Sequence, residues 1–181
     1  EYEYRNEGDN VRESFDIFQD VSIPADHYRF GYHTLDFRSA RKRWFSWGME
    51  YTTGQSFYGD QERYELDGRV QLTRNFSLSM DGEIDSRKYP ITPSPTGNHG
   101  GDFTAKLARF RATYSFNPDM YVSSFLQWEN ESDLMSMNTR FRWTIQPERE
   151  LFVVLNLGGY RGTRTVIQRD TAVKFAYNWR F

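Results

Sequence analysis

The chain has 181 residues with nearly balanced charges, 23 Lys and Arg against 25 Asp and Glu, so its net charge gives no electrostatic case for nucleic-acid binding. Aromatic residues make up 18% of the chain, which excludes a disordered protein, although only 38% of the residues are hydrophobic and the mean hydropathy is −0.81. The lack of cysteine excludes disulfide scaffolds and thiolate metal sites, and no apolar run approaches the roughly 18 residues of a membrane helix.

Alternation of apolar and polar residues is the main pattern along the chain, and it predicts strands and no helix. We expect residues 1–10 to be an N-terminal extension or a partial strand, and residues 11–181 to form one β-domain. Its ten predicted strands span residues 11–18, 28–38, 43–54, 62–72, 76–88, 103–116, 120–130, 137–145, 151–161 and 171–181. Many reach the roughly 9 to 11 residues with which a tilted strand crosses a bilayer.

The connections between these strands alternate in length. Short links stand at "SARK" (39–42), "TRN" (73–75), "NPD" (117–119) and "QPERE" (146–150), and longer ones at residues 54–61, 89–102, 129–135 and 161–170. Bacterial outer-membrane barrels have short periplasmic turns and long external loops, whereas a β-sandwich has no reason to sort its loops by length. The pattern predicts an all-β fold, an antiparallel transmembrane β-barrel with about ten strands in this chain.

The link "TRN" predicts how the strands on either side of it pair. If it is a three-residue hairpin loop with Asn75 in the left-handed region, Leu72 opposes Phe76. On the same face, the pairing opposes Val70 with Leu78, Gly68 with Met80, and Leu66 with Gly82. On the other face, it opposes Asp67 with Asp81 and Glu65 with Glu83.

The links "NPD" and "QPERE" predict two more hairpins by the same rule. Across "NPD" we expect Phe116, Tyr114, Ala112 and Phe110 to oppose Met120, Val122, Ser124 and Leu126, in that order. Across "QPERE" we expect Ile145, Trp143 and Phe141 to oppose Leu151, Val153 and Leu155. Each predicted hairpin therefore has one apolar face and one face that carries charges.

Aromatic residues mark both ends of the predicted apolar face. Near the short links lie Phe45, Phe76, Phe116, Trp143 and Phe181, and near the long links lie Tyr51, Tyr64, Trp128 and Tyr160. Two such girdles are typical of the two interfaces of a membrane barrel. The alternative interpretation is a soluble β-barrel or sandwich, in which these aromatics fill a core and a ligand binds inside.

The other face carries charged residues that we interpret as a lumen charge network: Glu65, Asp67, Asp81, Glu83, Arg109, Arg111, Arg140 and Arg142. Like charges directly opposite each other destabilise a sheet, so we expect the arginines to neutralise the acids. Such a network would fill a narrow lumen, whereas a wide lumen with this lining would pass or bind a charged solute. Ten strands are closer to the roughly eight that enclose only side chains than to the sixteen or more of a water-filled channel.

The chain ends on "AVKFAYNWRF", in which apolar side chains alternate along one face. The pattern resembles the terminal signal of outer-membrane barrels, an aromatic last residue preceded by apolar residues at alternate positions. That resemblance implies that Tyr177, Trp179 and Phe181 are recognised by the barrel-assembly machinery.

Three segments carry a resemblance to a known family: "FDIFQDVSIPADHYRF" (15–30), "NTRFRWTIQPERELFVVLN" (138–156) and "VKFAYNWRF" (173–181). They resemble the C-terminal barrel region of a bacterial outer-membrane family whose long members carry an N-terminal domain similar to family-nine carbohydrate-binding modules. The resemblance implies fold and location, and no established activity. It leaves open that the chain is the C-terminal part of a larger barrel. The chain departs from the family pattern at Asp26, where Gly is expected, and at residues 147–149, where Pro-Gly-Ser is expected.

The sequence offers no convincing catalytic, metal or cofactor site. The histidines His27, His33 and His99 are scattered, and only His33 lies within a predicted strand. His33 with Asp36 is the residual candidate for a hydrolase on the barrel wall. The acidic segment "ENESD" (129–133) is more simply a solvated loop than a calcium site.

These patterns predict a non-enzymatic barrel in the bacterial outer membrane, which acts as a membrane anchor or as a pore component with a charged lumen. The family resemblance connects it with surface carbohydrate handling or solute passage. Expected partners are outer-membrane lipid, the barrel-assembly machinery, and a partner subunit or the missing N-terminal domain. The alternatives are a soluble ligand-binding protein and a barrel-wall hydrolase.

Overall fold

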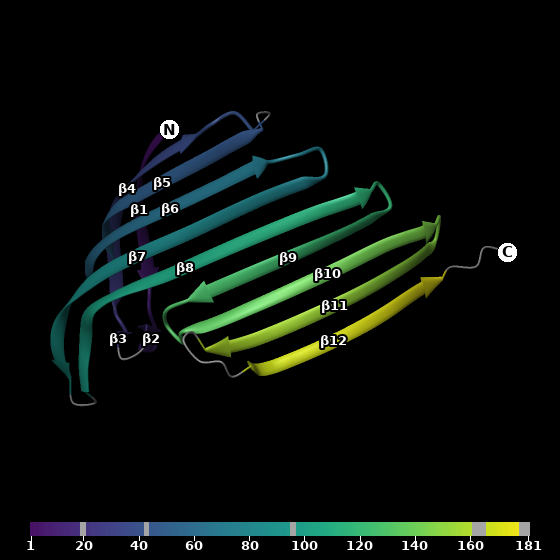
Figure 1. Ribbon diagram of the computed structural model, residues 1–181. Coiled ribbons are helices and arrows are strands. Elements are labelled where there is room, and N and C mark those ends of the chain that lie inside the picture. The colour runs from purple at the N-terminus through teal and green to yellow at the C-terminus, as the bar shows by residue number, and fades with distance from the viewer. Residues whose placement is uncertain (19–20, 42–43, 95–96, 161–165, 178–181) are drawn as a thin grey trace. The chain divides into compact units, whose positions relative to one another are not determined.

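The computed structural model describes residues 1–18, 21–41, 44–94, 97–160 and 166–177, without the side chains of residues 92–94, 97–99, 166 and 167. The chain is all-β, and ten strands form one antiparallel sheet in the order β1-β4-β5-β6-β7-β8-β9-β10-β11-β12 (Figure 1). These strands are β1 (Tyr2–Asn10), β4 (His27–Arg38), β5 (Phe45–Ser56), β6 (Gly59–Gln71), β7 (Phe76–Ser94), β8 (Gly97–Asn117), β9 (Met120–Glu129), β10 (Leu134–Gln146), β11 (Arg149–Tyr160) and β12 (Val166–Tyr177). In this part of the chain no closed barrel is found, and no helix is long and apolar enough to cross a membrane.

The first strand of the main sheet is β1, in the segment for which we expected an extension or a partial strand. All nine of its residues pair with β4, from Tyr2 opposite Leu35 to Asn10 opposite His27. Its polar residues have low strand propensity, and the backbone pairing with β4 overrides that preference. The predicted strand at 11–18 is wrong as a member of the main sheet. Only β2 (Phe15–Phe18) forms there, and it pairs with β3 (Val21–Ile23) in a separate two-stranded sheet.

The predicted alternation of short and long connections is not found between β4 and β8. From β8 onward it is found, since two-residue turns at 118–119 and 147–148 stand on either side of a longer link at 130–133. β5 and β6 are separated only by Phe57 and Tyr58, and β7 and β8 continue through most of the predicted loop at 89–102. β7 and β8 remain paired strands where turn-forming residues had predicted a loop, because pairing gives the backbone N–H and C=O groups hydrogen-bond partners. Here the strands are long and the loop is short, since β7 has 19 residues and β8 has 21.

The chain divides into two compact units, which are described one at a time below. Unit 1 comprises residues 1–39, 47–66 and 82–106, and unit 2 comprises residues 40–46, 67–81 and 107–181. β5, β6, β7 and β8 contribute residues to both units.

In unit 2 the hairpin predictions are confirmed in part. Across β8 and β9 the structure pairs Phe110, Ala112 and Tyr114 with Leu126, Ser124 and Val122, as expected. At the turn the prediction is wrong, because Asn117 and not Phe116 opposes Met120. The turn is shorter by one residue than a three-residue loop, and a register shift between Ser115 and Asn117 absorbs the difference.

The predicted pairing of β10 with β11 is wrong by two residues. Trp143 opposes Leu151 and Phe141 opposes Val153, because the turn contains only Pro147 and Glu148. Glu148 has a φ of 68°, the left-handed conformation that favours the glycine expected at this place. A slip of two residues keeps every side chain on its predicted face, since the strand period is two.

The hairpin at "TRN" agrees with its predicted pairing where the structure gives contacts. The predicted left-handed conformation of Asn75 is wrong, because Asn75 does not have a positive φ. The Leu72 amide donates to the Phe76 carbonyl at 3.0 Å, as expected for opposed residues. A Cβ built on Gly68 would lie 3.5 Å from the Met80 side chain, so these two residues face each other.

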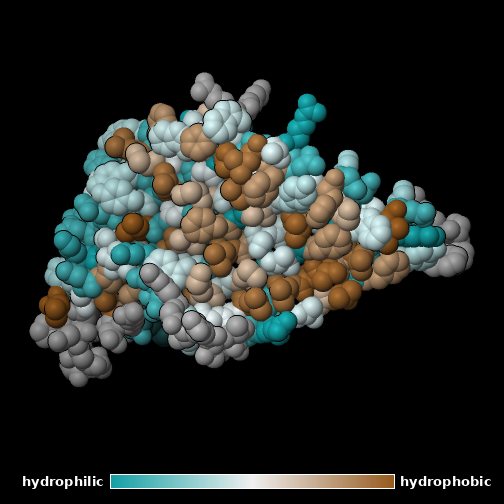
Figure 2. All heavy atoms as spheres, in the orientation of Figure 1, coloured by the Kyte–Doolittle hydropathy of each residue, from teal (hydrophilic) through white to brown (hydrophobic). Residues whose placement is uncertain are grey.

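Apolar side chains of unit 2 are exposed along its strands. Large hydrophobic residues with more than a third of their surface exposed include Phe110, Tyr114, Phe116, Trp143, Val173 and Phe175. Figure 2 shows hydrophobic side chains gathered over the strands of unit 2 in the orientation of Figure 1. Among the described residues, no hydrophobic side chain of unit 2 is buried.

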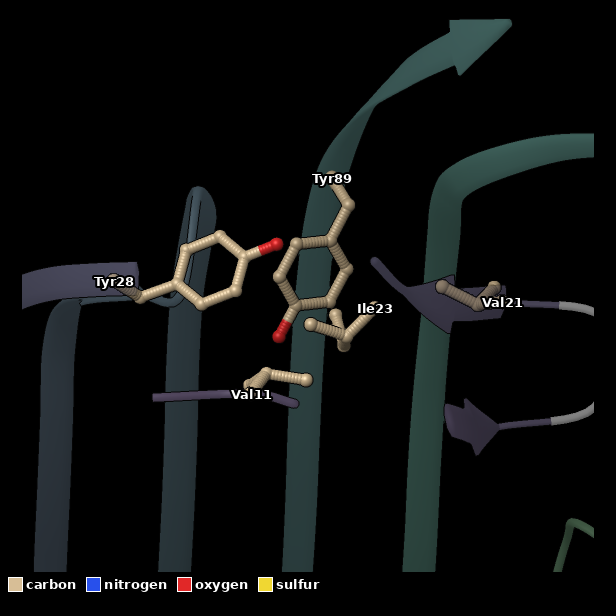
Figure 3. Packing of buried hydrophobic residues seen from close by; sticks show 5 residues of the cluster. All are labelled: Val11, Val21, Ile23, Tyr28 and Tyr89. Atoms are coloured by element: carbon tan, nitrogen blue, oxygen red, sulfur yellow. The ribbon is translucent and has the colours of Figure 1, made fainter. Parts of the chain in front are cut away.

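The buried hydrophobic side chains lie instead in unit 1, around the β2–β3 hairpin. They are Val11, Phe18, Val21, Ile23, Tyr28 and Tyr89. Ile23 is fully buried and Tyr89 is 2% exposed. Figure 3 shows Ile23, Val11 and Tyr28 around the ring of Tyr89, so residues from four segments of unit 1 meet at one point.

Candidate functional site

One face of the sheet in unit 1 is polar. Register places Glu3 opposite Thr34 and Arg5 opposite Tyr32, and across β4 and β5 it places Asp36 opposite Glu50. Alternation sends the neighbours of these residues to the other face, which carries exposed Tyr2, Tyr4, Leu35, Phe37 and Met49. We call the first of these the polar face and the second the apolar face.

Ion pairs on the polar face of unit 1 form mostly within single strands. Arg5 pairs with Glu3 at 2.8 Å, Arg38 with Asp36 at 2.9 Å, and Arg87 with Asp85 at 2.9 Å. Each acid stands two residues before its arginine, which puts both on one face of a strand. Sequence reasoning had looked for partners across strands and missed this acid-x-Arg spacing, although it is visible in the sequence.

The predicted acids Glu65 and Glu83 share one arginine in unit 1. Arg63 lies 2.8 Å from Glu65 and 3.0 Å from Glu83, so it stands between the two carboxylates that the sequence had opposed. This arrangement removes the like-charge repulsion that motivated the predicted network. The cation comes from within unit 1, and not from the four predicted arginines.

A cavity of about 680 Å³ lies on this polar face. Its wall includes Glu7, Glu50, Gln61 and the paired arginines. Aromatic residues Phe30, Tyr32 and Phe57 line it as well, and the Tyr32 hydroxyl donates to Glu7 at 2.8 Å. A concave site with convergent polar groups and aromatic walls is the usual form of a place that holds a solute.

In unit 2 the predicted arginines differ in what they contact. Arg109 pairs with Asp81, while Arg142 pairs with Glu150, an acid that was not predicted. The Arg111 guanidinium lies over the Phe125 ring, 5.2 Å from its centroid. Within the described ranges, neither Arg140 nor Asp67 has an ion pair, so the eight predicted residues do not form one network.

The unit 2 ion pairs are open to water. The side chains of Arg109 and Asp81 are both 42% exposed. Exposed pairs of this kind stabilise a fold by no more than about 1 kcal/mol. The Arg109–Asp81 pair therefore lies on an open, charged surface and not in a packed ionic core.

The aromatic core of unit 1 lies on the same polar face, at the end of the strands where Phe57 and Tyr58 turn, which we call the Phe57 end. Tyr28 is four residues from Tyr32 on β4, and Tyr89 is two residues from Arg87 on β7. Even separations put side chains on the same side of a strand, so both tyrosines lie on the polar face. The Tyr89 hydroxyl donates to Ser56 at 3.2 Å, and Arg87 donates to the same Ser56 hydroxyl at 3.0 Å.

The β2–β3 hairpin supplies the other half of this core. The rings of Phe18 and Phe103 stack with centroids 4.7 Å apart, and the ring of Phe15 meets that of Phe57 edge-on at 5.9 Å. Burial raises the pKa of the Tyr58 phenol, and Tyr89 nearby adds to the shift. The hairpin is thus packed against the polar face by aromatic contacts.

The residual hydrolase pair does not come together. His33 and Asp36 differ by three positions on β4, so their side chains project to opposite faces. The His33 Nδ1 lies 2.7 Å from the Tyr2 hydroxyl, and its ring packs against that of Tyr4. No group of three possible metal ligands occurs among the residues that the structure describes.

Of the predicted assembly signal, only Tyr177 lies within the described residues. It ends β12 opposite Arg149, which donates to its hydroxyl at 3.0 Å and places its guanidinium 4.7 Å from the ring centroid. Trp179 and Phe181 lie outside the described residues.

No protein-family model matches this chain, and no curated protein matches it either.

Proposed function

We propose that this chain is an outer-membrane β-barrel protein, or part of one, whose apolar face contacts lipid and whose polar face lines a hydrated lumen. It would serve as a membrane anchor or as a pore component in the bacterial outer membrane. The observation that carries this proposal is the exposed apolar face.

The exposure of that face is hard to reconcile with a water-soluble protein. Val173 is 68% exposed and Phe175 is 58% exposed, with Thr171 and Tyr177 on the same side of β12. Soluble monomers rarely leave large contiguous apolar patches in water, and such patches mark contacts with membranes or other proteins. Lipid is the environment that suits an apolar face repeated along several adjacent strands.

Strand length and aromatic positions support the same proposal. β9, β10 and β11 have 10, 13 and 12 residues, enough for tilted strands that need roughly 9 to 11 to cross a bilayer. On the apolar face of unit 2, Phe116, Trp143 and Tyr177 lie next to turns or strand ends. Aromatic side chains favour the membrane interface, where one end of the ring is apolar and the other is wet.

The polar face favours passage or binding of a solute over a purely structural role. Its cavity and its half-exposed ion pairs leave room for water beside charged groups. The connection with surface carbohydrate handling rests on the family resemblance alone. The barrel-assembly machinery is the expected partner for the C-terminal strand.

The test uses two adjacent valines of β11 that differ only in face. Val153 opposes Phe141 and Val173 on the apolar face, whereas Val154 opposes Arg140 and Ala172 on the polar face. Val153→Arg should destabilise the membrane-inserted protein by about 2 to 4 kcal/mol, because a charge on the lipid face is costly near the bilayer midplane. Val154→Arg is the matched control. It is made together with Arg140→Ala, so that no like charge opposes it, and should be tolerated.

The measurement is folding into lipid vesicles, followed by gel mobility and denaturant titration. A wild-type chain that is monodisperse without detergent, and indifferent to Val153→Arg, would contradict the proposal and favour the soluble ligand-binding alternative.

A further inference from the structure

We infer that the β2–β3 hairpin is an internal plug, which closes the polar face of unit 1 at the Phe57 end and is anchored by Ile23 and Tyr89. The inference rests on the proposed function, because a plug has a role only where the polar face lines a lumen. It assigns to residues 11–18 and 21–26 a part in controlling solute passage.

The course of the chain is the first argument. Residues 11–26 connect two paired strands, β1 and β4, and such a connection usually runs over the protein surface. Here it turns onto the polar face. Val21 of the hairpin lies 3.3 Å from the position of a Cβ built on Gly101, and Phe18 stacks on Phe103, so the hairpin contacts β8 as well as its own neighbours.

The burial pattern is the second argument. The described residues bury large apolar side chains only around this hairpin, while apolar side chains elsewhere remain exposed. Apolar burial drives the docking of a segment in proportion to the area removed from water. A connection that only joins β1 to β4 does not require a fully buried side chain such as Ile23.

The position of the cavity is the third argument. Phe30 and Phe57 line the 680 Å³ cavity and also pack against the hairpin core. Arg87 and Ser56 line it too, and both contact Tyr89 through hydrogen bonds of 3.4 Å and 3.2 Å. The polar cavity therefore ends directly at the apolar core, as a vestibule ends at a constriction.

The test is conductance of the reconstituted protein in planar bilayers, with insertion measured separately by protease protection in vesicles. Wild type should insert and show little steady conductance. Ile23→Asp places an unpaired charge in the core and should release the hairpin, which we expect to raise conductance severalfold. Ser22→Asp adds the same charge to the same strand on its other side and should leave conductance low.

A second variant avoids dependence on a charge in the core. The chain has no cysteine, so Phe18→Cys with Phe103→Cys gives a unique thiol pair at the stacked rings. Before treatment we expect raised conductance because the stack is lost. A short bifunctional thiol crosslinker should then return conductance to the wild-type level.

Each outcome decides something. Large steady conductance of wild type, or inserted variants whose conductance stays low and does not respond to the crosslinker, would overturn the plug and leave the barrel proposal intact. Failure of wild type to insert into vesicles would overturn the barrel proposal, and the plug with it. Raised conductance that the crosslinker reverses supports both.

Discussion

Unit 1 and unit 2 use the same kinds of residue in opposite ways. Unit 1 buries aromatic side chains on its polar face, around Ile23 and Tyr89, and forms most of its ion pairs within strands. Unit 2 buries no hydrophobic residue among those described, exposes its aromatics on the apolar face, and forms ion pairs across strands. The difference teaches that unit 1 has a buried core of its own, whereas the described part of unit 2 has none.

The largest effect that would sharpen this comparison is expected at the core of unit 1. Tyr89→Ala should lower the free energy of unfolding in detergent by about 3 to 5 kcal/mol, since it leaves a cavity at a site that cannot refill with lipid. Tyr114→Ala removes the same atoms from a ring of unit 2 that is 42% exposed and should have a much smaller effect. Denaturant titration followed by tryptophan fluorescence measures both, and equal losses would contradict the distinction between the units.

Ion pairs give the next largest contrast. The side chains of Arg87 and Asp85 are only 19% and 11% exposed, so Arg87→Ala leaves a nearly buried carboxylate unpaired and should cost about 3 kcal/mol. In unit 2 Arg109→Ala breaks a half-exposed pair, for which we expect at most about 1 kcal/mol.

Arg140→Ala extends the ion-pair series to a residue without an acidic partner in the described part of the chain. It should leave the free energy of unfolding unchanged. The three variants are compared at low and high salt, where screening should reduce only the effect of Arg109→Ala. A loss for Arg140→Ala as large as that for Arg87→Ala would show that unit 2 has a packed ionic network.

The smallest expected effect concerns the turns of unit 2. Glu148→Gly should stabilise the protein by up to about 1 kcal/mol, because Glu148 has a φ of 68° and a side chain there is strained. Asp119→Gly changes the corresponding turn between β8 and β9, where the residue does not have a positive φ, and should destabilise slightly. Thermal unfolding of the two variants side by side measures the difference, and a shift in the same direction for both would contradict this account.

Face assignment was the part of the fold that the sequence predicted best. The side chains of Phe110, Trp143 and Val173 lie on the apolar face as expected, and those of Arg109, Arg140 and Lys174 lie on the polar face. Alternation is a local property of an extended chain, so it survives even the two-residue error in pairing β10 with β11.

Pairing was predicted less well, because it depends on backbone hydrogen bonds between distant segments. The polar sequence of β1 does not predict a strand, yet every residue of β1 pairs with a residue of β4. Turn length set the actual register at Pro118 and at Pro147. The two turns are shorter than predicted by one and by three residues, which moved the partners of Met120 and Leu151.

By itself, the sequence determined that the chain is all-β, that its strands have one apolar and one polar face, and which residues stand on each. Only the tertiary structure decided that residues 11–18 and 21–26 fold onto the polar face, that Tyr89 is buried there, and that Arg63 and not Arg111 or Arg140 joins Glu65 to Glu83. The physical reason is the distance in sequence over which each feature is determined. A period of two follows from backbone geometry at each residue, whereas a buried core and an ion pair across strands require segments far apart in sequence to meet, and that meeting depends on the free energy of the whole fold.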